Sequence, residues 1–240
     1  MAVNPITCPR CQSTDVVKNG KIHNGRQNFK CKGGNRQFVQ NPTKKVIGQE
    51  TRDVSDKLLL ERLSLAGIAR VTWGSEQWLQ TYVNAKYSSV PKTVAAWSKK
   101  RGKLTIQCDQ MWSFVGNKKN KHLLWLAVDV NTGKIVGVCV GKRSREGAQG
   151  LWESLPAVYR QCVVCYTDFW SASERVIPQS RHRAVGKHSG NTNQIERFNC
   201  TLRQSVSRLV RDTLSFSKQL DNHIGAIWYF VPHYNLSLLL

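Results

Sequence analysis

The sequence predicts an α/β protein: a mixed β-sheet with flanking helices, preceded by a small cysteine module and a helical segment. Residues 104–240 alternate short β-branched runs, typical of buried strands, with longer stretches of helical apolar spacing. Residues 46–103 have helical spacing followed by a basic linker, and residues 1–45 contain a Cys-x-x-Cys motif. We therefore expect three parts with these boundaries.

The composition indicates a polyanionic partner. The 240 residues include 36 Lys and Arg but only 15 Asp and Glu, which gives a net charge of +21 and a pI near 10.0. Such an excess is typical of nucleic-acid-binding proteins. A membrane is the weaker alternative, because the longest apolar stretch, Ile224–Val231, is far shorter than the roughly 20 residues of a spanning helix. Eight cysteines without a signal peptide predict the reducing cytoplasm, in association with the nucleoid.

The cysteine module has the beginning of a structural zinc site. Cys8 and Cys11 form one knuckle, and Cys31 follows after nineteen residues. Two Cys-x-x-Cys knuckles at about this separation indicate zinc, but the position of the fourth cysteine holds Gly34.

Two interpretations of this module remain open. Three thiolates can hold zinc if His23 or a water molecule completes the tetrahedron. Alternatively, a ribbon without the metal is held together by Phe29 and Phe38.

The helical segment predicts a helix-turn-helix. Ser64 and Ser75 are suitable N-caps, and Thr72-Trp73-Gly74 supplies a turn between the last two helices. Residues 75–87 would then form the recognition helix, with Glu76, Gln77 and Gln80 directed toward a DNA groove. A helical packing module or a dimerisation surface explains the same spacing.

The remaining residues predict the order β-β-β-α-β-α-β-α. The expected strands are 104–112, 123–130, 134–140, 162–168 and 181–187, and the expected helices are 146–159, 193–210 and 216–230. We expect Pro232 to end the last helix.

Three acids in this segment are candidates for one catalytic cluster. Asp109 lies on the first strand, Asp168 ends the fourth and Glu196 lies on the first turn of a late helix. Carboxylates brought together in this way bind two divalent cations for phosphoryl transfer, and Mg²⁺ (or Mn²⁺) suits such oxygen ligands. Asn199 and Arg203 share a helical face with Glu196, where they can contact the scissile phosphate or flanking DNA.

Other polar residues nearby have structural roles in our interpretation. Asp129 precedes Asn131-Thr132-Gly133, so we assign it to a hairpin turn. Cys162 and Cys165 lie in an apolar run, so we assign them as buried thiols and not as a metal pair.

Three motifs resemble the acidic motifs of insertion-sequence-one family transposases. They are Cys108–Phe114 around Asp109, Tyr166–Trp170 around Asp168 and Asn193–Asn199 around Glu196. The resemblance implies a ribonuclease-H-like domain with a DDE triad at those three acids. It also implies that a zinc ribbon and helix-turn-helix recognise the element's terminal inverted repeats. Two residues depart from the family pattern: Gly34 in place of the fourth cysteine, and Gln110 where many relatives carry Glu.

The first functional hypothesis is therefore a DNA transposase that cleaves strands and joins them to target DNA, acting as a homo-oligomer on double-stranded DNA. The alternatives are a catalytically silent DNA-binding protein or repressor derived from a transposase, and a structure-specific nuclease of the same fold. Metal-dependent nicking and strand-transfer assays discriminate among the three.

Overall fold

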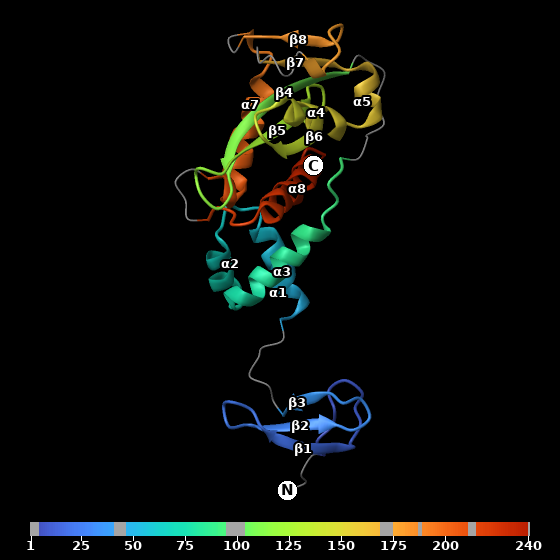
Figure 1. Cartoon of the computed structure of the whole chain (residues 1–240), viewed down its shortest axis with the longest axis vertical. Helices are drawn as coiled ribbons and strands as arrows, with labels where there is room; N and C mark the ends of the chain where they lie inside the picture. The colour runs from blue at the N-terminus through green and yellow to red at the C-terminus, as the bar shows by residue number, and fades with distance from the viewer. Residues whose placement is uncertain are drawn as a thin grey trace. The chain divides into compact units, whose positions relative to one another are not determined.

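The chain forms two compact units, Met1–Gln49 and Glu50–Leu240, in this computed structural model (Figure 1). The structure describes residues 5–40, 47–94, 104–168, 175–186, 189–210 and 215–239. Predictions about Trp170, Lys187 and most of the basic linker fall outside the described residues.

The first unit is a three-stranded antiparallel ribbon. Its strands β1 (Val16–Lys21), β2 (Gln27–Cys31) and β3 (Gln37–Val39) pair in chain order. Phe29 and Phe38 face each other across β2 and β3, with ring centroids 5.9 Å apart. His23 lies in the hairpin between β1 and β2, whereas Cys31 pairs with Val16 at the other end of these strands. The strand register therefore places His23 far from the cysteines.

The second unit begins with three helices, α1 (Gln49–Leu58), α2 (Leu65–Thr72) and α3 (Glu76–Ser89). The two predicted N-caps are confirmed. The Ser64 hydroxyl accepts from the Gly67 N–H at 3.0 Å, and the Ser75 hydroxyl accepts from the Trp78 N–H at 3.2 Å. Between α2 and α3 the chain turns through Trp73 in the left-handed region, with φ of 53°.

Helix α3 packs on the last helix, α8 (Leu220–Ser237). Leu79, Val83 and Tyr87 are buried on this side of α3. The approach is close at Gly225, where an added Cβ would lie 2.4 Å from the Cβ of Tyr87. The opposite side of α3 is exposed and polar, and it includes Gln77 and Gln80.

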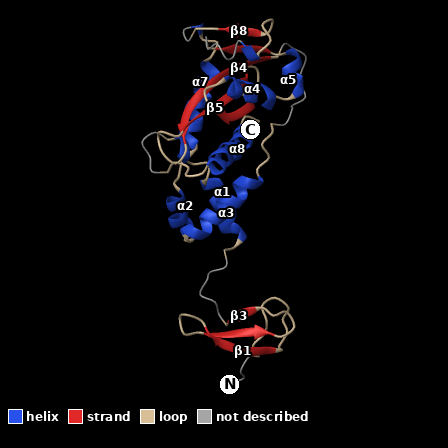
Figure 2. Ribbon diagram, in the orientation of Figure 1, coloured by secondary structure: helices blue, strands red, loops and turns tan. Residues whose placement is uncertain are grey.

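The core of the second unit is a five-stranded mixed sheet in the order β6-β5-β4-β7-β8 (Figure 2). Strands β4, β5 and β6 are antiparallel, whereas β7 and β8 run parallel to β4. The strands are β4 (Thr105–Phe114), β5 (Lys121–Asp129), β6 (Ile135–Gly141), β7 (Val164–Thr167) and β8 (His182–Ala184). The predicted mixed sheet with flanking helices is confirmed.

Helices cover both faces of this sheet. Leu124, Leu126 and Val128 pack in one apolar cluster with residues of α7 (Asn193–Ser205) and α8. Trp125 and Ala127 alternate with them and pack in a second cluster with residues of α4 (Arg145–Ser154). This alternation follows from the two-residue side-chain period of a strand.

The predicted helix 146–159 is wrong in one respect, because the structure has two helices there. Helix α4 ends at Ser154 and α5 spans Ala157–Cys162. Between them Leu155 is extended, since a residue before proline avoids the helical region. Cys162 consequently belongs to α5, and the strand begins at Val164 and not at 162. Cys165 is buried as predicted.

The prediction that Pro232 ends the last helix is also wrong, because α8 continues to Ser237. A proline inside a helix removes one backbone hydrogen bond. Here the residues before it, Ala226–Val231, are all buried, so packing maintains the helix through the proline. The predicted helix 193–210 likewise ends earlier, at Ser205, and a 3-10 turn spans Ser207–Leu209.

Candidate active site and thiolate cluster

Two of the three predicted acids lie on neighbouring parallel strands. Asp109 is on β4, the central strand, and Asp168 directly follows β7. Gln107 of β4 is in register with Tyr166 of β7, so two residues further along Asp109 lies beside Asp168. Strand alternation places Asp109 on the same face as Met111, which packs in the cluster with α7.

The third acid, Glu196, is on the first turn of α7, and a buried glutamine fixes this turn to β4. The side-chain oxygen of Gln107 accepts from the N–H groups of Gln194 and Ile195 at 3.0 and 3.1 Å. It thereby satisfies the free amides of a helix N-terminus that lacks a side-chain N-cap bond. The Thr192 hydroxyl donates to the Glu196 carboxylate at 3.0 Å.

We did not predict these supporting residues from the sequence. Gln107 gives little signal in the sequence, because β4 also carries Asp109, Gln110 and Ser113; only the fold shows that its side chain is 5% exposed. A buried polar side chain of this kind needs a partner. The identity of that partner, 87 residues further along the chain, depends on the tertiary fold.

The three acids line one cleft of about 770 Å³. Lys121, Lys142 and Arg143 line the same cleft, so cationic and anionic side chains share its walls. Cationic walls suit a polyanionic substrate, and the carboxylates suit hard cations.

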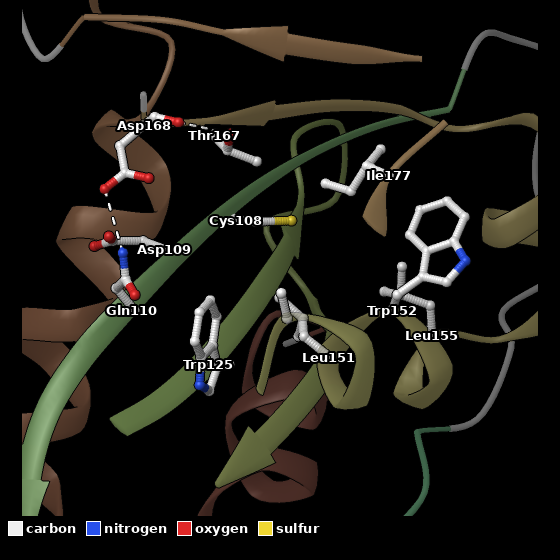
Figure 3. Close-up of a pocket in the computed structure, with 11 residues that line it drawn as sticks. Cys108, Asp109, Gln110, Trp125, Leu151, Trp152, Leu155, Thr167, Asp168 and Ile177 are labelled. Atoms are coloured by element: carbon white, nitrogen blue, oxygen red, sulfur yellow. Dashed lines mark hydrogen bonds between the residues drawn. The ribbon is translucent and has the colours of Figure 1, made fainter. Parts of the chain in front are cut away.

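Two amide side chains contact the aspartates. The Asn199 Nδ2 donates to an Asp109 carboxylate oxygen at 2.7 Å. The Gln110 Nε2 donates to an Asp168 carboxylate oxygen at 3.3 Å, shown as a dashed line in Figure 3. Arg203 donates to the main-chain oxygens of Leu209 and Trp112. The expected contacts of Asn199 and Arg203 with DNA stay predictions.

The carboxylates of Asp109, Asp168 and Glu196 do not all lie within 4.8 Å of one another. Among the described residues, only Cys8, Cys11 and Cys31 gather three potential ligand atoms that closely. Two cations about 3.5–4 Å apart, each with oxygens about 2.1 Å away, spread their ligands over up to roughly 8 Å. A two-ion site does not require its carboxylates to lie as close together as the three thiols do.

The three cysteines form the compact cluster of the first unit. Cys8 and Cys31 are buried, Cys11 is exposed, and the Cys11 and Cys31 sulfurs are 3.6 Å apart. Backbone N–H groups of Arg10 and Cys11 stabilise the thiolate and lower the pKa of Cys8 to about 7. His23 is not in this cluster, so the prediction that it supplies the fourth ligand is not supported.

Asp129 has the turn role that the sequence predicted. One carboxylate oxygen accepts from the N–H groups of Asn131 and Thr132, and the other accepts from the Tyr159 hydroxyl at 2.6 Å. The side chain is fully buried at the end of β5 and stands apart from the cleft residues.

A strongly basic chain with an acid-lined cleft in a mixed α/β sheet has the features of proteins that act on phosphodiesters. Comparison with known proteins identifies the family. Residues 104–235 match the model of the IS1 transposase, and residues 1–34 match that of the InsA N-terminal domain, a zinc ribbon. The chain belongs to the IS1 transposase family. Its N-terminal unit is accordingly a zinc ribbon that carries the cluster of Cys8, Cys11 and Cys31.

Curated relatives agree with this assignment. The insertion element iso-IS1n protein InsB of Shigella dysenteriae is 34% identical over 128 residues, which is 53% of this chain and 94% of that protein. The insertion element IS1 protein InsB of Shigella flexneri is 32% identical over 130 residues, 53% of this chain and 95% of the relative.

Among solved structures, a chain of the simian T-cell lymphotropic virus intasome, in complex with PP2A regulatory subunit B56 gamma, is similar with a TM-score of 0.41 and 16% identity. The match covers 75% of this chain and 68% of that one, and a likeness this weak adds nothing to the family assignment. No helix in the described parts of the chain has the length and apolar character needed to cross a membrane.

Proposed function

We propose that this transposase binds the terminal inverted repeats of its element and catalyses metal-dependent strand cleavage and strand transfer. Asp109, Asp168 and Glu196 are the proposed catalytic acids and metal ligands. The observation that carries the proposal is their convergence: two neighbouring parallel strands and a helix fixed to β4 through Gln107 place all three in one cleft.

The reaction is in-line phosphoryl transfer on DNA. When bound, Mg²⁺ or Mn²⁺ ions activate the attacking oxygen and stabilise the leaving oxygen. Asp109, Asp168 and Glu196 would hold the ions through their carboxylate oxygens. Lys121, Lys142 and Arg143 bind the phosphates of the strand in the cleft. The residues fit such ions because the ligand set consists of hard oxygens with neutral amides around them.

The other two parts of the chain recognise DNA in this proposal. The ribbon of residues 1–45 holds zinc through Cys8, Cys11 and Cys31 and contacts phosphates through its basic residues. The helix-turn-helix in residues 46–103 presents Gln77 and Gln80 of α3, both exposed, to a groove of the end sequence. Residues 104–240 form the ribonuclease-H-like catalytic domain. Two or more copies act together on DNA in the cytoplasm, at the nucleoid.

The test replaces one acid without changing its size. Asp168→Asn should reduce cleavage of end-sequence DNA to background in Mg²⁺ or Mn²⁺, with DNA affinity changed less than twofold. The control is Asp221→Asn, the same substitution at an exposed acid on α8 outside the cleft, which should leave cleavage intact. An Asp168→Asn protein that still cleaves would overturn the assignment. A wild-type protein that binds the ends but never nicks them, at any concentration of either metal, would be the DNA-binding derivative instead.

A further inference from the structure

The two amides beside the catalytic acids share an unusual arrangement. Asn199 on α7 and Gln110 on β4 each donate the amide NH₂ group to a different aspartate. The other end of each amide, Asn199 Oδ1 and Gln110 Oε1, is buried and accepts no hydrogen bond from the described residues.

The orientation of both amides follows from charge. Rotating either amide by 180° would place its oxygen against a carboxylate oxygen, and two acceptors would then face each other. The NH₂ groups therefore face the aspartates, and the unsatisfied atoms are the carbonyl oxygens. A buried acceptor without a hydrogen-bond partner destabilises the folded state. Two such oxygens within one site indicate that a hydrogen-bond donor contacts them when the site is in its active, metal-bound form.

We propose that Asn199 and Gln110 are positioning residues of the metal site. Each NH₂ group fixes one aspartate in the orientation that binds a cation, and each carbonyl oxygen accepts a hydrogen bond from a water molecule coordinated to that cation. This inference rests on the proposed function, because it requires Asp109 and Asp168 to be the metal ligands.

A neutral amide can perform this task without changing the net charge of the site. A lysine or arginine at either position would neutralise the aspartates and compete with the cation. A further carboxylate would add to the repulsion among three acids until cations are bound. The amide donates to an ionised oxygen and leaves the net charge of the site unchanged. Partners of metal ligands that act in this way typically contribute 10–100-fold to metal affinity.

The first experiment measures Mn²⁺ binding to the full-length protein by electron paramagnetic resonance of free Mn²⁺. Asn199→Leu and Gln110→Leu remove the donor and the acceptor at similar size, and each should weaken Mn²⁺ binding by 10–100-fold. The control is Gln204→Leu, at an exposed glutamine of α7 outside the cleft, which should bind Mn²⁺ as the wild type does. Wild-type Mn²⁺ affinity in both cleft variants would overturn the inference.

A second pair of variants covers the case in which a leucine disrupts folding. Asn199→Asp and Gln110→Glu keep the shape but place a negative charge against each aspartate. Their melting temperatures should be lower than that of wild type in EDTA and should recover in Mn²⁺, because the cation screens the added charge. If the melting temperature fell by the same amount with and without Mn²⁺, the role of these amides would be purely structural, and this result would also overturn the inference. Failure of the proposed function is distinguishable, because Asp168→Asn would then retain cleavage whatever the amide variants do.

Discussion

The two candidate metal sites of this chain differ in how their ligands are held. The three thiols of the ribbon lie within 4.8 Å of one another, although the fourth position of their tetrahedron has no cysteine. The three carboxylates of the cleft supply a full set of acids, but they are spread further apart.

The difference follows from charge. Thiols are neutral when protonated, so two sulfurs can approach to 3.6 Å. Two carboxylates 4 Å apart near a protein surface repel each other by about 4 kcal/mol at an effective dielectric constant of about 20. The acids are instead held by separate elements and by the amides of Asn199 and Gln110. In this chain the thiols come from neighbouring parts of the small ribbon, whereas the carboxylates come from elements far apart in the sequence.

The largest expected effect tests the ribbon. Cys31→Ser should abolish zinc binding and unfold residues 5–40, because structural zinc contributes on the order of 10 kcal/mol to the folding of such small units. The exposed Cys200→Ser is the matched control and should retain full zinc content. Zinc analysis and NMR spectra of the ribbon resonances measure both. If the ribbon of Cys31→Ser were still folded and still contained zinc, Cys31 would not be a zinc ligand on which the folding of this unit depends.

The next largest effect is a loss of stability of the second unit at low pH, which the ribbon should not share. His223 of α8 is 1% exposed, and its Nε2 is bonded to the Ser113 hydroxyl at 3.1 Å. Burial, and then the charges of His122 and Arg208, lower the pKa of His223 from 6.5 to about 4. The unfolded chain therefore binds a proton more readily than the folded one.

The resulting stability is fully present above pH 6.5 and decreases as the pH falls from 6.5 to about 4, by about 3 kcal/mol in total. Urea unfolding of the second unit across this range measures it. His223→Gln should flatten the dependence, while His23→Gln, at an exposed histidine of the ribbon, should not. An unchanged pH profile in His223→Gln would assign the acid sensitivity to other groups.

The sequence was sufficient for the features that depend on local chemistry. The caps at Ser64 and Ser75 and the turn role of Asp129 were predicted because each follows from a few adjacent residues. The mixed sheet was predicted from the order of strands and helices along the chain. The two prolines were harder to interpret. Pro156 separates two helices where one was expected, and Pro232 is accommodated within α8, where the residues directly before it, Ala226–Val231, are all buried.

The supporting contacts of the cleft could not be predicted for a different reason. The Asn199–Asp109 and Gln107–Gln194 bonds join residues about 90 apart in the chain, and no local pattern encodes such a pairing. The motifs identified the three acids from the sequence, and the catalytic role of these acids is a proposal. Only the register of β4 with β7 indicates how Asp109 and Asp168 meet.

A smaller effect tests whether the ribbon site is incomplete. Gly34 stands where a second Cys-x-x-Cys knuckle would end, and an added Cβ there meets no atom within 4 Å. Gly34→Cys should supply a fourth thiolate and slow zinc loss to a chelator at least tenfold, because a closed tetrahedron holds structural zinc more firmly. Gly33→Cys, one residue out of register and equally unobstructed, is the control. Equal zinc loss from both variants would mean that another group already completes the tetrahedron.

The smallest expected effect tests whether the carboxylate cleft binds a metal ion. A ligand that binds only the folded state stabilises it by about 1.4 kcal/mol when its concentration is ten times its Kd. Mg²⁺ should therefore raise the melting temperature of the second unit by a few degrees without changing the zinc content of the ribbon. Asp109→Asn should remove this increment, because it deletes one of the proposed ligands and leaves an amide that binds cations weakly. If Mg²⁺ stabilised Asp109→Asn and the wild type equally, the carboxylate cleft would not be the site of the ion. The ribbon would then be the one candidate metal site of the two that binds a metal.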